Sequence, residues 1–180
     1  VDLIRNFIYM AEADCSHMLR VPSMEYNVLL PVVNSRVVIP ADYIELRALT
    51  WQGGSVQNTF QYLPWDQFVM VDNRTEGQPQ FFSRQGNTWY LNGDPGDDSL
   101  VLCNYYGFIS DLSPNNQQNW VLSLSPMVYL YGALKYLYEF TMDNDRSAYW
   151  NERFITEINK LQLIADNAEH SGTSLAIRNY

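Results

Sequence analysis

Hydrophobic residues recur at helical spacing at both ends of the chain. In residues 2–20 the apolar positions are Leu3 or Ile4, Phe7 or Ile8, Ala11, Cys15, and Met18 or Leu19. Steps of three and four residues put such positions on one face of an α-helix. The pattern therefore predicts a helix over residues 2–20, which Pro22 ends.

The same spacing returns in residues 126–170, with one interruption. The first stripe comprises Val128, Tyr131, Leu134, Leu137 or Tyr138, and Met142, and the second comprises Tyr149 or Trp150, Phe154, Ile158, Leu161 and Ala165. Pro126 suits a first helical turn with Ser125 as its cap, and Asp145 is the expected cap of the second helix. Two helices with a short polar joint predict an antiparallel hairpin.

Residues 24–110 have a different pattern, in which short β-branched and aromatic runs alternate with Gly, Pro, Asn and Asp. This pattern predicts strands over residues 26–30, 36–39, 43–51, 59–62, 80–83, 88–91 and 100–106. Turns are expected at Gly53-Gly54, at Gly86-Asn87 and at 92–96, and residues 64–68 suit a short helix.

The order of these elements predicts an α+β fold. We expect a helical bundle, made of the N-terminal helix and the C-terminal helix pair, with a β-rich insertion and an extended C-terminal tail. The helices are grouped because none of the three can bury its apolar stripe alone. The expected domains are residues 1–22 with 111–170 for the helical bundle, 23–110 for the β-rich insertion domain and 171–180 for a C-terminal arm.

The composition favours a protein whose surface is covered by partners. Charged residues make up 17% of the 180 residues, and aromatic residues make up 14%, including 13 Tyr and 5 Trp. Tyr and Trp suit contact surfaces because each has an apolar body and a polar tip. A net charge of −9 disfavours tight binding to phosphates, although nucleic acid can still pass beside an acidic wall.

The two cysteines, Cys15 and Cys103, belong to no metal or redox motif. We interpret them as buried, reduced side chains rather than as a disulfide, which fits synthesis in a cytoplasm. The sequence has no run of 18 apolar residues, so no transmembrane helix and no membrane partner are expected.

Motifs of catalysis and metal binding are absent from the sequence. It has no nucleophile elbow, zinc-protease helix, phosphate-binding loop or Cys-x-x-Cys pair, and its only histidines are His17 and His170. We therefore expect no enzyme activity, no catalytic residue, no cofactor and no metal. His17 is interpreted as a surface or interface residue, and the acidic clusters at 94–98 and 143–147 as turns rather than calcium sites.

The tryptophans admit two interpretations. They can stack on sugars, as in a carbohydrate-binding module, or pack in the core and at subunit contacts. We favour packing, since large aromatic side chains dominate cores and interfaces. The five residues are Trp51, Trp65, Trp89, Trp120 and Trp150. The sugar alternative predicts that Trp89→Ala abolishes glycan binding while the fold is retained.

A series of segments runs through the chain from about residue 4 to 178. It comprises IPADYIELR at 39–47, GQP at 77–79 before Phe81-Phe82, the hairpin to Tyr105-Tyr106, Leu112-Ser113, NWVL at 119–122, PMVYLYGAL at 126–134 and residues 145–150. In this order the segments resemble the phage head-to-tail adaptor (connector) proteins of the tail-tubular-protein-A kind, which occur in short-tailed phages.

The resemblance implies a structural virion protein without an active site. It implies a homo-oligomeric ring, typically a dodecamer, that docks under the portal, joins it to the tail and lines the DNA channel during ejection. It also implies a β-rich portion that faces the tail and a C-terminal segment that reaches the portal. The residues of that portal interface are Ser171, Gly172, Thr173, Ser174, Leu175, Ala176, Ile177, Arg178, Asn179 and Tyr180.

The expected partners follow from this resemblance. They are copies of the same chain, the portal protein and a tail nozzle or tube protein, whereas genomic DNA passes without specific binding. We expect some of the acidic residues Glu152, Glu157, Asp166 and Glu169 to face the channel. The expected location is the head–tail junction of the virion, after synthesis in the cytoplasm of a bacterial host. A carbohydrate-binding or adhesin module of the phage tail stays open as the alternative.

Overall fold

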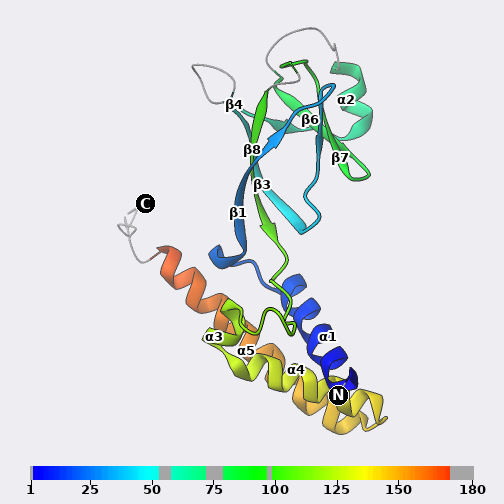
Figure 1. Ribbon diagram of the computed structural model, residues 1–180, viewed down its shortest axis with the longest axis vertical. Helices are drawn as coiled ribbons and strands as arrows, with labels where there is room; N and C mark the ends of the chain where they lie inside the picture. Colours follow the sequence, from blue (N-terminus) through cyan, green and yellow to red (C-terminus); the bar gives the residue numbers. More distant parts are fainter. Residues whose placement is uncertain (1, 53–57, 72–78, 97–98, 171–180) are drawn as a thin grey trace, which may run out of the picture. The chain divides into compact units, whose positions relative to one another are not determined.

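The chain forms two compact units. The structure, a computed structural model, describes residues 2–52, 58–71, 79–96 and 99–170. The helical unit comprises Val1–Met24 and Phe108–Tyr180, and the β-rich unit comprises Glu25–Gly107. Helices and sheets are both present (Figure 1), so the predicted α+β class is confirmed.

The helical unit is built from both ends of the sequence. Its elements are α1 (Asp2–Met18), the short 3-10 helix η1 (Pro22–Met24), α3 (Trp120–Leu124), α4 (Pro126–Phe140) and α5 (Asn144–His170). α1 packs against α4, and α4 also packs against α3 and α5. In Figure 1, α4 and α5 run side by side.

The predicted apolar stripes of the first and last helices are confirmed in part, since both Leu3 and Ile4 at the start of the first stripe are exposed. The buried members of the two stripes are Phe7, Ala11, Cys15 and Leu19 at α1, and Phe154, Ile158 and Leu161 on α5. Gly132 of α4 lies where these stripes meet. A Cβ atom at this position would lie 2.5 Å from the Cβ of Ala11 and 3.0 Å from Cε2 of Phe154. Three helices therefore approach one another through a position that has room only for glycine.

The stripe predicted for α4 is partly wrong. The buried residues of this helix are Val128, Tyr129 and Gly132. Met142, the last predicted member, lies after the helix with a backbone φ of 59°, and its side chain is 87% exposed. The hydrophobic pattern missed the buried face because Gly132, at its centre, has no side chain to mark it.

The predicted helix caps also need correction. Ser125 occupies the N-cap position of α4, but its hydroxyl makes no capping bond and donates instead to Oε2 of Glu157 at 3.4 Å. At the start of α5, Oδ1 of Asp143 accepts from the backbone N–H of Arg146 at 3.2 Å. Asp143 is thus the cap, and Asp145 lies in the first turn of the helix.

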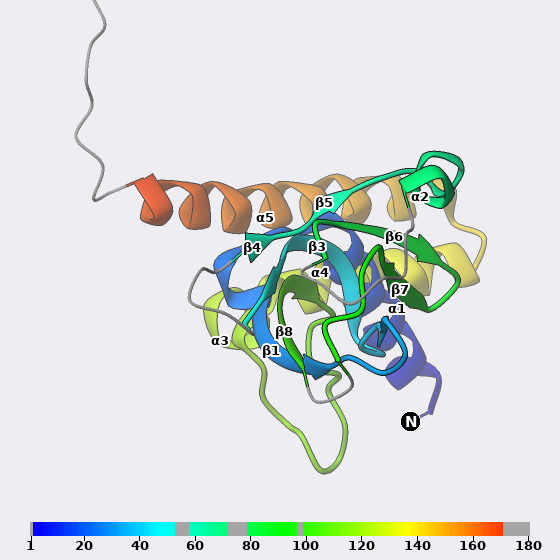
Figure 2. The same ribbon diagram turned by 90° about the horizontal axis from the view of Figure 1, so that it is seen from above.

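The β-rich unit contains two four-stranded sheets. The first has the order β1 (Glu25–Pro31), β8 (Leu100–Gly107), β3 (Tyr43–Trp51) and β4 (Asn58–Thr59), with antiparallel neighbours. The second has the order β2 (Arg36–Val38), β7 (Thr88–Leu91), β6 (Phe81–Gln85) and β5 (Gln61–Tyr62), and β5 pairs with β6 in parallel. α2 (Trp65–Val71) packs against β6. Figure 2 looks down on these strands, with β3 beside β8 and β6 beside β7.

One apolar core serves both sheets. Its buried members are Val32, Val37, Ile39, Leu49, Trp51, Phe60, Phe82, Trp89, Leu91, Val101, Cys103 and Tyr105. Alternate residues of β8 are buried, so one face of this central strand points into the core. The hydroxyl of Tyr105 donates to Oδ1 of Asp42 at 2.9 Å, which gives this buried ring a polar partner.

The strand predictions are largely confirmed. The predicted strands 43–51 and 88–91 coincide with β3 and β7. β6 and β7 form a hairpin at Gly86-Asn87, and Gly86 has a φ of 61°, as a tight hairpin turn requires. The predicted turn at Gly53-Gly54 lies outside the described residues.

The single strand predicted over residues 59–62 is wrong. Phe60 is buried, and its backbone N–H donates to the carbonyl oxygen of Leu49 at 2.8 Å. The chain therefore leaves the first sheet at Phe60 and joins the second, so that β4 and β5 belong to different sheets.

Candidate assembly site

His17 and the acidic clusters are the candidate chemical groups of the sequence. His17 is exposed, and its ring meets the ring of Phe108 edge-on at 5.8 Å. No group of three or more His, Cys, Asp or Glu side chains is arranged to hold a metal within residues 2–52, 58–71, 79–96 and 99–170. Asp97, Asp98 and the side chain of His170 lie outside the described part.

The two cysteines are free and buried, as predicted, and they lie in different units. Burial raises the pKa of each thiol, for Cys15 and Cys103 alike, to about 12. Such thiols stay protonated near neutral pH and are poor nucleophiles. Both cysteines therefore act as packing residues.

The interior of the helical unit contains a polar network centred on Glu12, a feature that the sequence reading missed. Glu12 is 2% exposed. Its carboxylate accepts from the backbone N–H of Leu112 at 2.9 Å, from Nδ2 of Asn119 at 3.1 Å and from the hydroxyl of Tyr129 at 3.1 Å. Burial raises the pKa of Glu12, although these three hydrogen bonds act in the opposite direction.

Asn119 connects this network to the start of α3. Its Oδ1 accepts from the backbone N–H of Leu122 at 2.9 Å, so Asn119 caps α3 while its Nδ2 donates to Glu12. The backbone N–H of Ile109 also donates to the hydroxyl oxygen of Ser16 at 3.2 Å. The network therefore holds the segment 108–119 against α1. Two sequence signals were available: Glu12 beside the buried stripe, and Asn before the apolar run at 120–122.

A second polar cluster joins α1 to α4. Oδ2 of Asp14 accepts from Nζ of Lys135 at 2.9 Å and from the hydroxyl of Tyr136 at 2.7 Å. Burial, with the neighbouring Asp14 carboxylate, raises the pKa of Tyr136. Two tyrosines of α4, Tyr129 and Tyr136, thus donate hydrogen bonds to carboxylates of α1.

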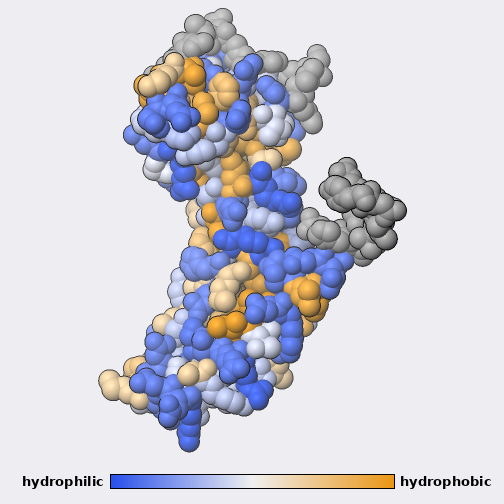
Figure 3. Space-filling view, turned by 180° about the vertical axis from the view of Figure 1, so that it is seen from behind, coloured by the Kyte–Doolittle hydropathy of each residue, from blue (hydrophilic) through white to orange (hydrophobic). Residues whose placement is uncertain are grey.

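The surface of the helical unit, in contrast, exposes many large hydrophobic side chains. They include Leu3, Ile4, Tyr9, Met10, Met18, Phe108, Leu124, Met127, Leu130, Leu137, Phe140, Met142, Tyr149, Leu163 and Ile164. Figure 3 shows hydrophobic side chains on the face of this unit beside the C-terminal end of α5. Exposed apolar surface of this extent is typical of a protein that is covered by partners.

The largest aromatic side chains of the β-rich unit do not form a sugar platform. Trp89 is 1% exposed and Trp51 is also buried, so neither can stack on a ligand. Trp65 is 38% exposed and contacts the rings of Phe68 and Tyr90. Trp89 is therefore a core residue. The prediction that it binds sugar in a carbohydrate-binding or adhesin module is wrong.

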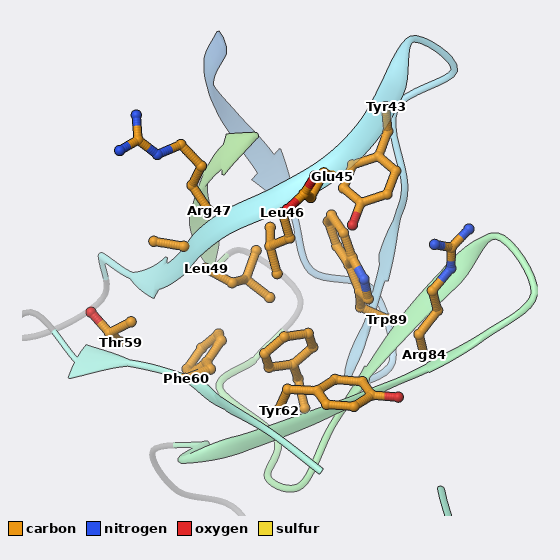
Figure 4. Close-up of a pocket in the computed structure, with 12 residues that line it drawn as sticks. Tyr43, Glu45, Leu46, Arg47, Leu49, Thr59, Phe60, Tyr62, Arg84 and Trp89 are labelled. Carbon is orange, nitrogen blue, oxygen red and sulfur yellow. The ribbon is translucent and has the colours of Figure 1, made fainter. Parts of the chain in front are cut away.

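A pocket of about 470 Å³ opens between strands of the two sheets. Figure 4 shows the rings of Tyr43, Phe60 and Tyr62 around it. The Arg84 guanidinium lies 5.4 Å from the centre of the Tyr43 ring, where it covers one side of the pocket. The lining combines aromatic rings with the charged residues Glu45, Arg47 and Arg84, and it contains no histidine or cysteine.

The predicted portal interface, residues 171–180, lies outside the described residues. The acidic side chains predicted for a channel lie on α5, of which Glu152 and Asp166 are exposed. Glu157 is half-buried and pairs with Nζ of Lys160 at 2.6 Å. The side chain of Glu169 is not among the described ones. None of the described helices has an apolar stretch that could span a bilayer.

Comparison with known proteins gives one family. Residues 1–178 match the family described as SU10 adaptor protein. The comparison with curated proteins gives no match. The matched range spans the helical and the β-rich unit alike, and it agrees with the resemblance to phage head-to-tail adaptors. The chain belongs to the SU10 adaptor protein family.

Proposed function

We propose that this chain is the subunit of a ring, a dodecamer, that joins the portal of a phage head to the tail and lines the channel for DNA ejection. Membership of the adaptor family over residues 1–178 carries this proposal. That membership implies a virion component that assembles with portal and tail components, and it suggests a role other than catalysis.

The two units have separate tasks in this proposal. Residues 1–22 and 111–170 act as a helical bundle at the portal side, and residues 23–110 act as a β-rich domain that faces the tail nozzle or tube. Residues 171–180 act as an arm that attaches to the portal. The subunit is made in the cytoplasm of the bacterial host before it joins the virion.

Contacts between neighbouring subunits would cover the apolar surface of the helical unit. A closed ring uses two different faces of each subunit, one for each neighbour. Exposed side chains on both α1 and α4, among them Ile4, Met10, Leu130 and Phe140, support such a pair of faces. The low charge of the chain has the same explanation, since interface cores are depleted of charged residues.

Acidic side chains of α5 supply the lining of the channel in this proposal. Glu152 and Asp166 are exposed, and a wall of like charge lets DNA pass without binding it. Changing Glu152 to Lys would then slow DNA ejection without preventing assembly. The matched control is Glu45→Lys, an exposed position in the β-rich unit.

The decisive experiment images the assembly. The chain is mixed with the portal protein of the same phage and examined by negative-stain electron microscopy. We expect rings bound to one end of the portal. Free monomers under every condition, with intact portal present, would sink the proposal.

The arm is tested by deleting residues 171–180. The fold should be retained in circular dichroism, because the buried residues that the structure describes in the helical unit all precede this segment. Recovery of the portal in a pull-down should fall strongly. A variant with the same ten residues in scrambled order controls for length, and full recovery with either variant would refute the arm.

A further inference from the structure

An apolar groove runs along the surface of the helical unit at the end of the chain that leads into the arm. It has a volume of about 260 Å³. Its lining residues are Val21, Pro22, Ser23, Trp120, Leu124, Leu161, Ile164, Ala165 and Ala168. Leu124 and Ile164 on its rim are more than half exposed. Glu12, Asn119 and Tyr129, which form the buried polar network, do not line this groove.

We infer that residues 171–180 of the same chain occupy this groove in the free subunit, running back along α5. The inference goes beyond the adaptor function, and it does not depend on attachment to a portal. Three observations support it: the place where the segment begins, its hydrophobic pattern and its charge.

The segment begins at the groove. α5 ends at His170, and Ala168, two residues earlier, lines the groove. Gly172 then follows the helix. A glycine just after a helix permits the left-handed backbone that ends the helix and reverses the chain. Reversal at this point directs the following residues back along α5.

The hydrophobic pattern of the segment fits an apolar groove. Leu175 and Ile177 are separated by one residue, so in extended chain both side chains point to the same face. A cavity of roughly 150 Å³ holds one benzene molecule, so the groove has room for two aliphatic side chains. Burial of both side chains also covers Leu124 and Ile164, which are otherwise exposed to water.

The length of the segment and its one positive charge also fit a path along α5. Leu161 and Ala168 lie on the face of α5 that lines the groove. Glu157 lies on the same face, one helical turn closer to the start of α5 than Leu161. Eleven residues of helix, from Ala168 back to Glu157, rise about 16.5 Å. Five residues of extended chain, from Thr173 to Arg178, also span about 16.5 Å. Arg178, the one basic residue of the segment, therefore reaches the carboxylate of Glu157.

Docking of this kind affects assembly. A docked arm keeps Leu175 and Ile177 covered before the subunit meets its partner. Attachment of the arm to a portal would then require its release from the groove. The groove and the portal would compete for the same side chains.

Disulfide trapping in the isolated full chain tests the inference. Leu175→Cys is combined with Ile164→Cys on the groove, or with Leu163→Cys as the control. Leu163 and Ile164 are adjacent and have nearly equal exposure, 59% and 62%, but only Ile164 lines the groove. The native cysteines are buried and should not interfere. Formation of the disulfide is followed by intact mass under mild oxidation.

We expect the groove pair to close within one chain at least about tenfold faster than the control pair, because docking raises the local concentration of the two thiols. Adding Ile177→Asp should bring the rate of the groove pair down to that of the control. Equal rates for both pairs would overturn the inference. Disulfides that form mainly between two chains would overturn it as well, since they would place the arm on a second copy.

Discussion

The two units differ in how their buried polar side chains are hydrogen-bonded. In the helical unit the buried carboxylate of Glu12 accepts hydrogen bonds from Leu112, Asn119 and Tyr129. In the β-rich unit, the buried polar atoms Trp51 Nε1, Ser83 Oγ and Asn104 Oδ1 make no hydrogen bond to another described group. The helical unit thus uses polar contacts to hold a segment in place, whereas the β-rich unit depends on aromatic packing.

The largest effect is expected from removing a core aromatic of the β-rich unit. Trp89→Ala should lower the free energy of unfolding by about 3–5 kcal/mol, because it leaves a cavity among Tyr43, Phe82 and the rest of the core. Urea unfolding followed by circular dichroism and fluorescence measures the loss. Trp65→Ala, at an exposed position, is the control and should cost about 1 kcal/mol.

This experiment also tests how far the two units depend on each other. If the helical signal of Trp89→Ala survives to higher urea than the β-rich signal, the units unfold separately. Equal losses for Trp89→Ala and Trp65→Ala would show that aromatic packing is not what stabilises the β-rich unit.

The second largest change in stability is expected for Gly132→Ala in the helical unit. In an open helix, Gly→Ala stabilises by about 1 kcal/mol. Here Gly132→Ala should instead destabilise by about 1–3 kcal/mol, because the new methyl group meets Ala11 and Phe154. Thermal or urea unfolding gives the sign directly. A stabilised variant would mean that α1, α4 and α5 separate more easily than their packing indicates.

These two positions show what the sequence could reveal about the fold. Trp89 lies in a short run of β-branched and aromatic residues, so its strand follows from a local pattern, and packing was the favoured of two interpretations for its side chain. Gly132 has no side chain and contributes nothing to such a pattern, although it is where three helices meet. Local periodicity therefore gave most helices and strands but not the contacts between them.

The candidate site shows the same limit more strongly. The network of Glu12, Asn119 and Tyr129 joins residues more than 100 positions apart, and no short motif records such a contact. The split of residues 59–62 between two sheets has a similar cause. Phe60 turns into a core that is assembled from distant strands, which overrides its local preference for a continuous strand.

A smaller effect separates the observed cap of α5 from the predicted one. Asp143→Ala removes the acceptor of the Arg146 N–H and should cost about 1 kcal/mol. Asp145→Ala loses only the attraction between a carboxylate and the helix start, about 0.3 kcal/mol. Thermal unfolding of both variants measures the difference. Equal losses of stability in the two variants would indicate that Asp145 caps the helix as well.

The smallest expected effect is the change with pH in the free energy of unfolding that is due to Glu12. It tests the contrast between the two units most directly. Burial raises its pKa above the ordinary value of 4.5, so the folded state holds this proton more tightly than the unfolded chain does. The stability that this group contributes is complete below pH 4.5 and is lost as the pH rises through the folded-state pKa.

Glu12→Gln, which cannot ionise, isolates this contribution. The free energy of unfolding of the natural chain, minus that of the variant, should fall as the pH rises above 4.5 and then level off. Urea unfolding at a series of pH values measures this difference, in which other titrating groups cancel. A difference that rises with pH would mean that the hydrogen bonds from Leu112, Asn119 and Tyr129 outweigh burial. The ionised carboxylate would then stabilise the helical unit, and holding segment 108–119 would depend on its charge.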